Sequence, residues 1–372
     1  MSNTQKKNVP ELRFPGFEGE WEEKKLESII KVNSGKDYKH LDKGDIPVYG
    51  TGGYMTSVSE PLSEIDAVGI GRKGTINKPY LLEAPFWTVD TLFYCTPKKE
   101  TDILFILSLF RKINWKVYDE STGVPSLSKQ TINKINRFVP TNKEQQKIGK
   151  FFSKLDRQIE LEEQKLELLQ QQKKGCMQKI FSQELRFKDE NGNDYPNWTN
   201  ERLGEVTTVT MGQSPKSVNY TDNSNDTVLI QGNADIENGL INPRIYTREV
   251  TKLIQKDEII LTVRAPVGKL AMAQINACIG RGVCSIKGDK FLYYFLEWFA
   301  TQNKWIRFSQ GSTFESISGN DIRNIHIKIP VEDERTKIIK LLNSLDVLNS
   351  KTDLKIQNLK QRKKSLLQKL FI

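Results

Sequence analysis

Residues 140–181 read PTNKEQQKIGKFFSKLDRQIELEEQKLELLQQQKKGCMQKIF, and residues 330–371 read PVEDERTKIIKLLNSLDVLNSKTDLKIQNLKQRKKSLLQKLF. The two stretches align without a gap at one constant offset, so that Phe181 meets Phe371. A repeat of this length predicts that the chain contains two copies of one structural plan.

The repeat extends to the opening of each half. Residues 11–14 (ELRF) recur as residues 184–187, and Trp21 recurs as Trp198. The stretch between these openings and the later repeats differs in length and sequence between the two halves. The edges of each half therefore form a shared scaffold, and the middles have diverged.

Length and composition limit the class of protein. A chain of 372 residues corresponds to two or three domains of roughly 150 residues each. No run of about 18 apolar residues occurs, and the first residues are polar, so we expect no membrane span, no signal peptide and a cytoplasmic location. The four cysteines include no CxxC pair, and the two histidines are far apart in sequence. We therefore expect neither a zinc site nor a disulfide framework.

The net charge of +10 is unevenly distributed. Residues 334–371 carry 10 Lys and Arg against 3 Asp and Glu, whereas the two diverged middles are nearly neutral. A basic chain suggests a nucleic-acid partner, but the middles would have to bind it through local patches or together with other proteins. The alternative is that the basic segment is only the solvated face of a helix.

The repeated stretches are predicted to be long helices, because neither contains a proline between residues 144–181 or 334–371. Apolar residues recur at alternating spacings of three and four, the pattern of a heptad seam. The seam residues are Leu155, Ile159, Leu166, Leu169 and Ile180 in the first copy and Leu345, Ile356, Leu359, Leu366 and Leu370 in the second. Polar residues interrupt the seam at Glu162 and Lys173 in the first copy and at Asn349, Thr352 and Lys363 in the second, and such positions set register and orientation.

Each helix would be about 57 Å long and needs a partner along its length. The other copy in an antiparallel arrangement is the nearest candidate, and a coiled coil between two chains is the alternative.

The diverged middles are predicted to be mixed α/β domains. Short β-favouring runs alternate with turns, and each domain contains one aromatic-rich helical stretch, at residues 103–117 and 291–308. A Ser-rich loop and a final strand ending at Pro140 or Pro330 follow. The predicted fold is therefore mixed α/β, with two variable domains alternating with two long helices as a pseudo-twofold repeat. The boundaries are residues 1–143 and 184–333 for the domains and 144–183 and 334–372 for the helices.

Catalytic motifs are scarce. Residues 69–74 formally match GxGxxG after a strand-like run, but residues 75–79 are a poor helix, and a dinucleotide fingerprint needs a helix there to hold the pyrophosphate. A flexible basic turn is favoured, and a nucleotide-dependent enzyme built on these glycines is the alternative. With no phosphate loop or HExxH motif, we predict that the chain is not an enzyme.

Short cationic and Ser-rich loops are the candidate DNA contacts, because Arg and Lys bind phosphate and guanine and hydroxyls donate hydrogen bonds. In the first half these are Lys36, Arg72, Lys73, Lys78, Ser126, Ser128 and Lys129. In the second half these are Gln213, Ser214, Arg264, Lys269, Arg281, Ser312, Thr313, Ser316 and Ser318. The alternative for the Ser-rich loops is that they cap the next helix.

The alternation of unlike domains with similar helices, the opening NVPELRFPGFEGEW, the GST loop before Ser-x-Ser and the segment EQQKIGKFFSKLD together resemble the specificity subunit of type I restriction-modification systems. The resemblance implies a bacterial, cytoplasmic protein whose two target-recognition domains each recognise one half of a split, asymmetric sequence in double-stranded DNA. It also implies that the helices set the gap between the halves and bind two methyltransferase subunits, with restriction subunits completing the complex. S-adenosylmethionine, ATP and Mg would belong to those partners, and this chain would bind no cofactor and no metal.

One departure limits the transfer of residues between halves. The second domain carries residues 265–267 (APV) where the first carries residues 73–75 (KGT). A functional alternative to the family is a cytoplasmic coiled-coil scaffold that binds proteins and has no DNA specificity.

Overall fold

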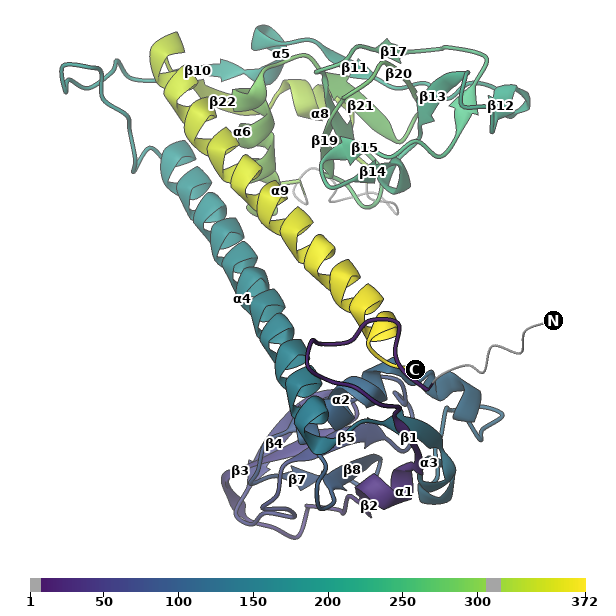
Figure 1. Ribbon diagram of the computed structural model, residues 1–372. Coiled ribbons are helices and arrows are strands. Elements are labelled where there is room, and N and C mark those ends of the chain that lie inside the picture. Colours follow the sequence, from purple (N-terminus) through teal and green to yellow (C-terminus); the bar gives the residue numbers. More distant parts are fainter. Residues whose placement is uncertain (1–7, 306–315) are drawn as a thin grey trace. The chain divides into compact units, whose positions relative to one another are not determined.

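The computed structural model of the chain describes residues 8–305 and 316–372, and Figure 1 shows their helices and strands. The chain forms two compact units. The first extends to Gln164 and also includes Asp353–Ile372, and the second is Lys165–Thr352. Both boundaries fall inside the long helices, so each unit contains one variable domain and a portion of each helix.

The first unit begins with a strand that pairs with the strand before the long helix. In chain order its elements are β1 (Glu22–Lys25), α1 (Leu26–Ile29), β2 (Ile30–Ser34), β3 (Lys43–Gly50), β4 (Gly53–Val58), β5 (Ala67–Gly71), β6 (Tyr80–Leu82), β7 (Trp87–Thr88), β8 (Leu92–Pro97), α2 (Ile103–Lys112), the 3₁₀ helix η1 (Trp115–Tyr118), α3 (Lys129–Lys134), β9 (Asn136–Val139) and the start of α4 (Asn142–Phe181). The strands form an antiparallel sheet β2-β8-β5-β6, a smaller sheet β4-β3-β7 and the pair β1-β9.

The second unit repeats this plan with a larger sheet system. After the end of α4, its elements are β10 (Thr199–Arg202), α5 (Leu203–Val206), β11 (Val209–Met211), η2 (Ser217–Asn219), β12 (Tyr220–Thr221), β13 (Thr227–Ile230), η3 (Asn233–Asp235), β14 (Ile236–Glu237), β15 (Leu240–Ile241), β16 (Tyr246–Thr247), β17 (Leu253–Ile254), β18 (Ile259–Thr262), β19 (Leu270–Met272), β20 (Ala277–Ile279), β21 (Val283–Ile286), α6 (Lys290–Thr301), α8 (Gly319–Arg323), β22 (His326–Ile329) and the start of α9 (Glu332–Lys369). The sheet orders are β11-β21-β18-β19-β15-β14, β12-β16-β13-β20-β17 and β10-β22.

The mixed α/β prediction is confirmed, and the aromatic-rich stretches form buried helices that are shorter than expected. Helix α2 ends at Lys112 rather than at residue 117. The Trp115 indole donates a hydrogen bond of 2.7 Å to the Phe110 carbonyl, which folds that residue back into the separate turn η1. Helix α6 ends at Thr301, and the predicted residues 306–308 lie outside the described residues.

The predicted long helices are confirmed as α4 and α9, and within each unit they are antiparallel neighbours. In the first unit, Ile148 and Phe152 of α4 share a core with Leu370 and Phe371 from the end of α9. In the second unit, the end of α4 shares a core with the beginning of α9, the residues being Met177, Ile180, Phe181, Ile338, Leu342 and Leu345. Of the predicted seam, Leu155, Ile159, Ile180, Leu345, Ile356 and Leu370 are buried, and Leu166, Leu169, Leu359 and Leu366 are half-buried.

The two lysines that interrupt the seam each pair with an aspartate of the other long helix. Lys363 forms an ion pair with Asp156 in the first unit, and Lys173 lies 2.7 Å from Asp346 in the second. These are the same two repeat positions with the helices exchanged. On α4, Lys173 lies seventeen residues after Asp156, and on α9, Asp346 lies seventeen residues before Lys363. Both units therefore use one antiparallel register.

Burial makes these charged pairs costly if they are disturbed. Burial lowers the pKa of Lys363, and Asp156 opposes that shift. Lys173 also lies 2.7 Å from Glu297 of α6, whose pKa is raised by burial and lowered in part by the lysine charge. Lys173 therefore holds two carboxylates close to one another.

The last aromatic residue of each long helix completes the core of the variable domain in the other half of the sequence. Phe371 stacks on Phe105 of α2 with ring centroids 5.5 Å apart. Phe181 stacks on Trp298 of α6 at 5.5 Å. Burying an aromatic side chain contributes on the order of 2–3 kcal/mol, so the end of each helix is fixed to a domain core.

The recurring ELRF sequence has a structural role. Arg13 makes two hydrogen bonds of 2.8 Å to Glu144 in the first turn of α4. Arg186 makes two of 2.7 Å to Glu334 in α9, and this carboxylate also accepts from the Trp198 indole at 2.9 Å. Both glutamates are buried, so each depends on its arginine for charge compensation.

Replacing Arg186 with Met is predicted to destabilise the second unit by about 3–5 kcal/mol, because it leaves the Glu334 carboxylate buried without a cation. Urea unfolding followed by circular dichroism measures the change. The control is Arg202→Met. Arg202 lies in the same unit and forms no ion pair with a described residue, so this variant should change stability little. Equal losses in the two variants would contradict the buried-pair account.

Replacing Lys173 with Met is predicted to cost roughly 1–3 kcal/mol at neutral pH, because Glu297 and Asp346 then face each other without the lysine. Mutual repulsion raises the folded-state pKa of a carboxyl above its unfolded value, so its favourable contribution is present at low pH and is lost as pH rises. The deficit should therefore shrink between pH 7.5 and about pH 5. Lys174→Met, at the exposed neighbouring position, is the matched control, and a pH-independent deficit would contradict the assignment.

Candidate nucleic-acid interface

The predicted contacts of the first half converge on one pocket in the first unit. Arg72 and Lys73 follow β5, and Ser126, Ser128 and Lys129 lie in the loop before α3 and at its start. All five line a pocket of about 380 Å³, together with Ser34, Phe93 and Leu127. The sequence separates these residues by more than fifty positions, and the fold brings them together.

Backbone hydrogen bonds fix the two walls of this pocket to each other. Lys73 and Ser126 form an antiparallel bridge, and the Leu127 amide donates to the Arg72 carbonyl at 2.9 Å. The Arg72 guanidinium lies 5.9 Å from the centre of the Phe93 ring. Both cations remain exposed, so a rigid backbone presents them to solvent.

Two carboxylates that the sequence reasoning missed organise the Ser-rich loop. Asp119 accepts hydrogen bonds from the amides of Ser121 and Ser126, which lower the pKa of its carboxyl, the Ser126 bond most strongly. Glu120 accepts from the hydroxyls of Thr131 and Ser128, and these bonds lower its pKa. Depressed carboxyl pKa values stabilise the loop above the ordinary pKa of about 4, and that contribution is lost as pH falls. In the sequence, the feature that indicates this role is an acidic pair, Asp119 and Glu120, directly before a Ser-rich segment.

The second serine of each Ser-x-Ser is a helix cap. Ser128 accepts from the Thr131 amide at 3.1 Å and begins α3. Ser318 accepts from the Asp321 amide at 3.2 Å and begins α8. The capping alternative therefore holds for these two hydroxyls. No hydrogen bond from the Ser126 hydroxyl to a described residue occurs, so that group is available to a ligand.

The second unit repeats the arrangement with different side chains. Arg264 and Ser316 form an antiparallel bridge, and the Ile317 amide donates to the Val263 carbonyl at 3.0 Å. Arg264 therefore occupies the position of Lys73. The sequence alignment that placed residues 265–267 opposite residues 73–75 is one position out of register with this bridge, because sequence identity there is too low to fix a loop.

Gln213, Ser214 and Arg281 lie at neighbouring strand ends of the second unit. The Ser214 hydroxyl accepts from the Arg281 amide at 3.0 Å, and the Gln213 amide donates to the Ile279 carbonyl at 2.9 Å. A Cβ at Gly212 would lie 2.1 Å from the Gly280 carbonyl oxygen, so this close approach requires glycine. Arg281 is exposed beside it.

The remaining predicted contacts differ in position. Lys36 is exposed in a loop whose amide donates to the Thr88 carbonyl, and Lys78 is exposed after β5, but neither lines the pocket. The Lys269 ammonium donates hydrogen bonds to the Asn233 and Ile236 carbonyls at 3.2 and 2.6 Å. The charge of this side chain is therefore engaged within its own domain. Ser312 and Thr313 lie outside the described residues.

The strand–turn at residues 69–74 does not form a dinucleotide site. Strand β5 continues into a turn and returns as the antiparallel strand β6, with no helix between them. Among the described residues, no cluster of three or more His, Cys, Asp and Glu side chains is arranged to hold a metal. Within the same residues, no helix has the length and apolar character needed to cross a membrane.

Two successive regions, residues 18–171 and 195–361, match the family described as type I restriction modification DNA specificity domain. The chain belongs to this family. The two matches correspond to the two halves of the repeat, and each match contains one variable domain and most of one long helix.

Relatives in the DNA specificity family include two chains of Methanocaldococcus jannaschii. The chain is 30% identical over 261 residues to the proposed type I restriction enzyme MjaX specificity subunit. The aligned region covers 66% of this chain and 61% of that protein. It is 25% identical over 312 residues to the type I restriction enzyme MjaVIII specificity subunit, covering 77% and 71% of the two chains. The chain thus spans about 61% of the length of the MjaX subunit.

Solved structures share the fold. The type I restriction-modification S subunit from M. genitalium superposes with a TM-score of 0.69 at 16% identity, covering 98% of this chain and 99% of that one. A chain from work on complex assembly and conformational transition of the type I R-M system gives 0.56 at 20% identity, covering 96% and 98%. The family fold is therefore preserved while most side chains differ.

Ser128→Ala is predicted to destabilise the start of α3 by about 1 kcal/mol, the usual contribution of an N-cap. Native-state hydrogen exchange of the Thr131 amide measures this locally. Ser126→Ala is the matched control, and its exchange in α3 should be unchanged because its hydroxyl caps nothing. Equal acceleration in both variants would contradict the division of roles between the two serines.

Proposed function

We propose that this chain is the DNA sequence-recognition subunit of a type I restriction-modification complex. Each variable domain recognises one half of a bipartite, asymmetric target in double-stranded DNA. The observation that carries the proposal is the position shared by Lys73 and Arg264, an exposed cation bridged to a Ser-rich loop in each of two otherwise unlike domains. Membership of the DNA specificity family supports it.

The two candidate contact surfaces favour different half-sites. Lys73 and Arg264 differ in chemistry, because the guanidinium can bond guanine through two donors and an ammonium acts as a point charge. Phe93 and Leu127 line the first pocket, whereas Gln213 and Arg281 stand near the strand ends of the second domain. One scaffold with two unlike surfaces suits an asymmetric target better than a palindrome.

The chain itself is proposed to be non-catalytic. In this scheme methyltransferase subunits supply S-adenosylmethionine chemistry, and restriction subunits supply ATP-dependent, Mg-dependent cleavage. The only formal nucleotide motif, residues 69–74, is a strand and turn.

The long helices are proposed to bind two methyltransferase subunits. Leu161 and Leu354 in the first unit are 49% and 57% exposed, and Leu168 and Val347 in the second are 65% and 43% exposed. Leu161 and Leu168 are seven residues apart on α4, as are Val347 and Leu354 on α9, so each pair recurs on one helix face. Exposed apolar residues at heptad spacing suit the docking of partner helices. A coiled-coil scaffold without DNA specificity would also display them, so DNA selectivity is the discriminating property.

The decisive experiment uses the chain with its methyltransferase partner and maps methylated adenines across a genome. Lys73→Ala should relax base preference in one half of the target, and Arg264→Ala in the other, each by roughly 1–3 kcal/mol of discrimination. Lys31→Ala, an exposed lysine on β2 away from the pocket, is the control. Methylation that does not depend on this chain, or relaxation of both halves by either variant, would contradict the proposal.

The helices are also proposed to set the gap between the half-sites. Deleting residues 163–169 and 350–356 together removes one heptad from each helix and preserves the Asp156–Lys363 and Lys173–Asp346 pairs. Seven residues are about 10 Å of helix, which is roughly 3 base pairs at 3.4 Å each. The preferred gap on methylation mapping should change accordingly. A target with an unchanged gap would contradict this role of the helices.

A further inference from the structure

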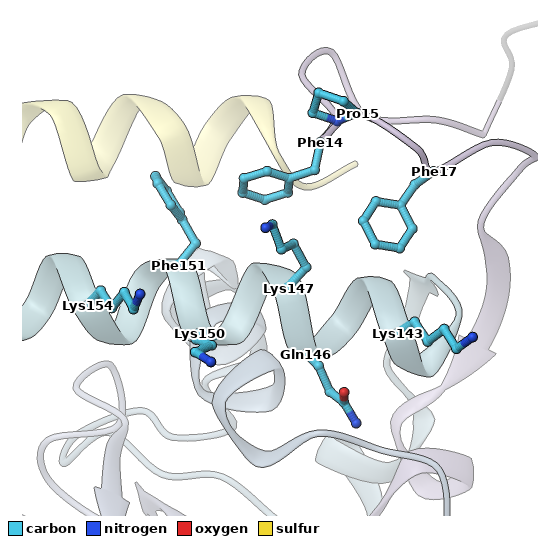
Figure 2. Close-up of a pocket in the computed structure, with 9 residues that line it drawn as sticks. All are labelled: Phe14, Pro15, Phe17, Lys143, Gln146, Lys147, Lys150, Phe151 and Lys154. Carbon is cyan, nitrogen blue, oxygen red and sulfur yellow. The ribbon is translucent and has the colours of Figure 1, made fainter.

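A groove with a volume of about 770 Å³ lies along the N-terminal part of α4 in the first unit. Figure 2 shows four lysines of α4 beside aromatic side chains from the N-terminal segment. The lysines are Lys143, Lys147, Lys150 and Lys154. The pocket lined by Arg72, Lys73 and Ser126 lies in the first variable domain and shares no residue with this groove.

The four lysines form a continuous cationic stripe. Their spacing of four, three and four residues places them on neighbouring turns of one helix, and all four are exposed. None of them forms an ion pair with a residue in the described parts of the chain. Lys147 extends over the Phe14 ring, with its ammonium 5.7 Å from the ring centre. The charge of this stripe is therefore uncompensated.

Aromatic side chains supply an apolar wall. Phe14 packs edge-on against Phe151 with ring centroids 5.4 Å apart, and Phe17 lines the groove further along the segment. Arg13 fixes this segment, because its guanidinium binds both Glu144 and the Glu18 carbonyl. The wall is held in place before any partner arrives, which reduces the entropic cost of binding.

The groove is specific to the first repeat. At the positions of Lys143 and Lys154, the second repeat carries Asp333 and Ser344. Lys337, at the position of Lys147, is held by a hydrogen bond of 2.6 Å to the Lys188 carbonyl and lies over the Tyr195 ring. Lys340 retains the position of Lys150, but within the described residues only the first repeat carries all four lysines beside the phenylalanines.

We infer that this groove binds an acidic, amphipathic helical segment of a partner protein, with one copy per chain. Carboxylates at spacings of four, three and four on the partner helix would face the lysines, and an apolar side chain between them would contact the phenylalanines. The aromatic wall favours a protein over duplex phosphate, because phosphate gains nothing from an apolar surface. This partner site is additional to the DNA-reading role and does not depend on it.

The test is fluorescence anisotropy with the full chain and a labelled synthetic helix of about 18 residues. The helix carries Glu at the four–three–four spacing with Leu between them. We expect binding at one peptide per chain. The double variant Lys147→Glu/Lys150→Glu should weaken peptide binding at least about tenfold, as expected for loss of a central charged contact. The matched control is Lys337→Glu with Lys340→Glu in the second repeat, which should bind like the unmodified chain.

Phe17→Ala provides a second test of the aromatic wall and should also weaken binding, since this side chain lies outside the core clusters. Equal binding of a scrambled peptide, two peptides per chain, or no loss in the Lys147/Lys150 variant would overturn the inference. Loss of duplex DNA binding in that variant without peptide binding would instead identify a phosphate surface. Methylation mapping of the same variant separates the two proposals, because its target sequence should be unchanged.

Discussion

The antiparallel contact between α4 and α9, fixed in each unit by one Asp–Lys pair, is the constraint on which the structure depends. Apolar seams permit several registers and both orientations, and partly buried charges disfavour the arrangements that leave them unpaired. Asp156 with Lys363 and Asp346 with Lys173 satisfy the same register in both units. The duplication of one helical sequence supplies both members of each pair, so the chain carries its own helix partner.

Several residues that recur between the halves stabilise the scaffold, whereas the candidate contact residues differ between the two domains. Arg13 and Arg186 neutralise buried glutamates, and Phe181 and Phe371 complete aromatic cores. The second serine of the shared Ser-x-Ser sequence also has a structural role, because it caps the helix that follows. By contrast, Lys73 and Arg264 occupy one structural position with different chemistry. The exposed loops can therefore vary without altering the contacts that hold the helices.

The sequence predicted the fold well because its signals are long and repeated. Heptad spacing over nearly forty residues predicts α4 and α9, and the polar interruptions of the seam, Lys173 and Lys363 among them, indicate where register is set. The candidate site is harder to predict from the sequence, because it depends on contacts between loops that are distant in sequence. Lys269 resembles a DNA contact in sequence, yet its ammonium binds backbone carbonyls. Asp119 and Glu120 organise the pocket through local hydrogen bonds that charge counting did not reveal.

An exchange of one variable domain tests most directly the proposal that a constant scaffold carries two independent DNA-recognition domains. Residues 26–135, between β1 and β9, would be replaced by the corresponding stretch of a family member with a different target. Methylome sequencing of cells carrying the hybrid and the methyltransferase would then define the new site. If the two domains recognise DNA independently, one half of the target changes while the other half and the gap between them stay the same. A change in both halves, or in neither, would contradict it.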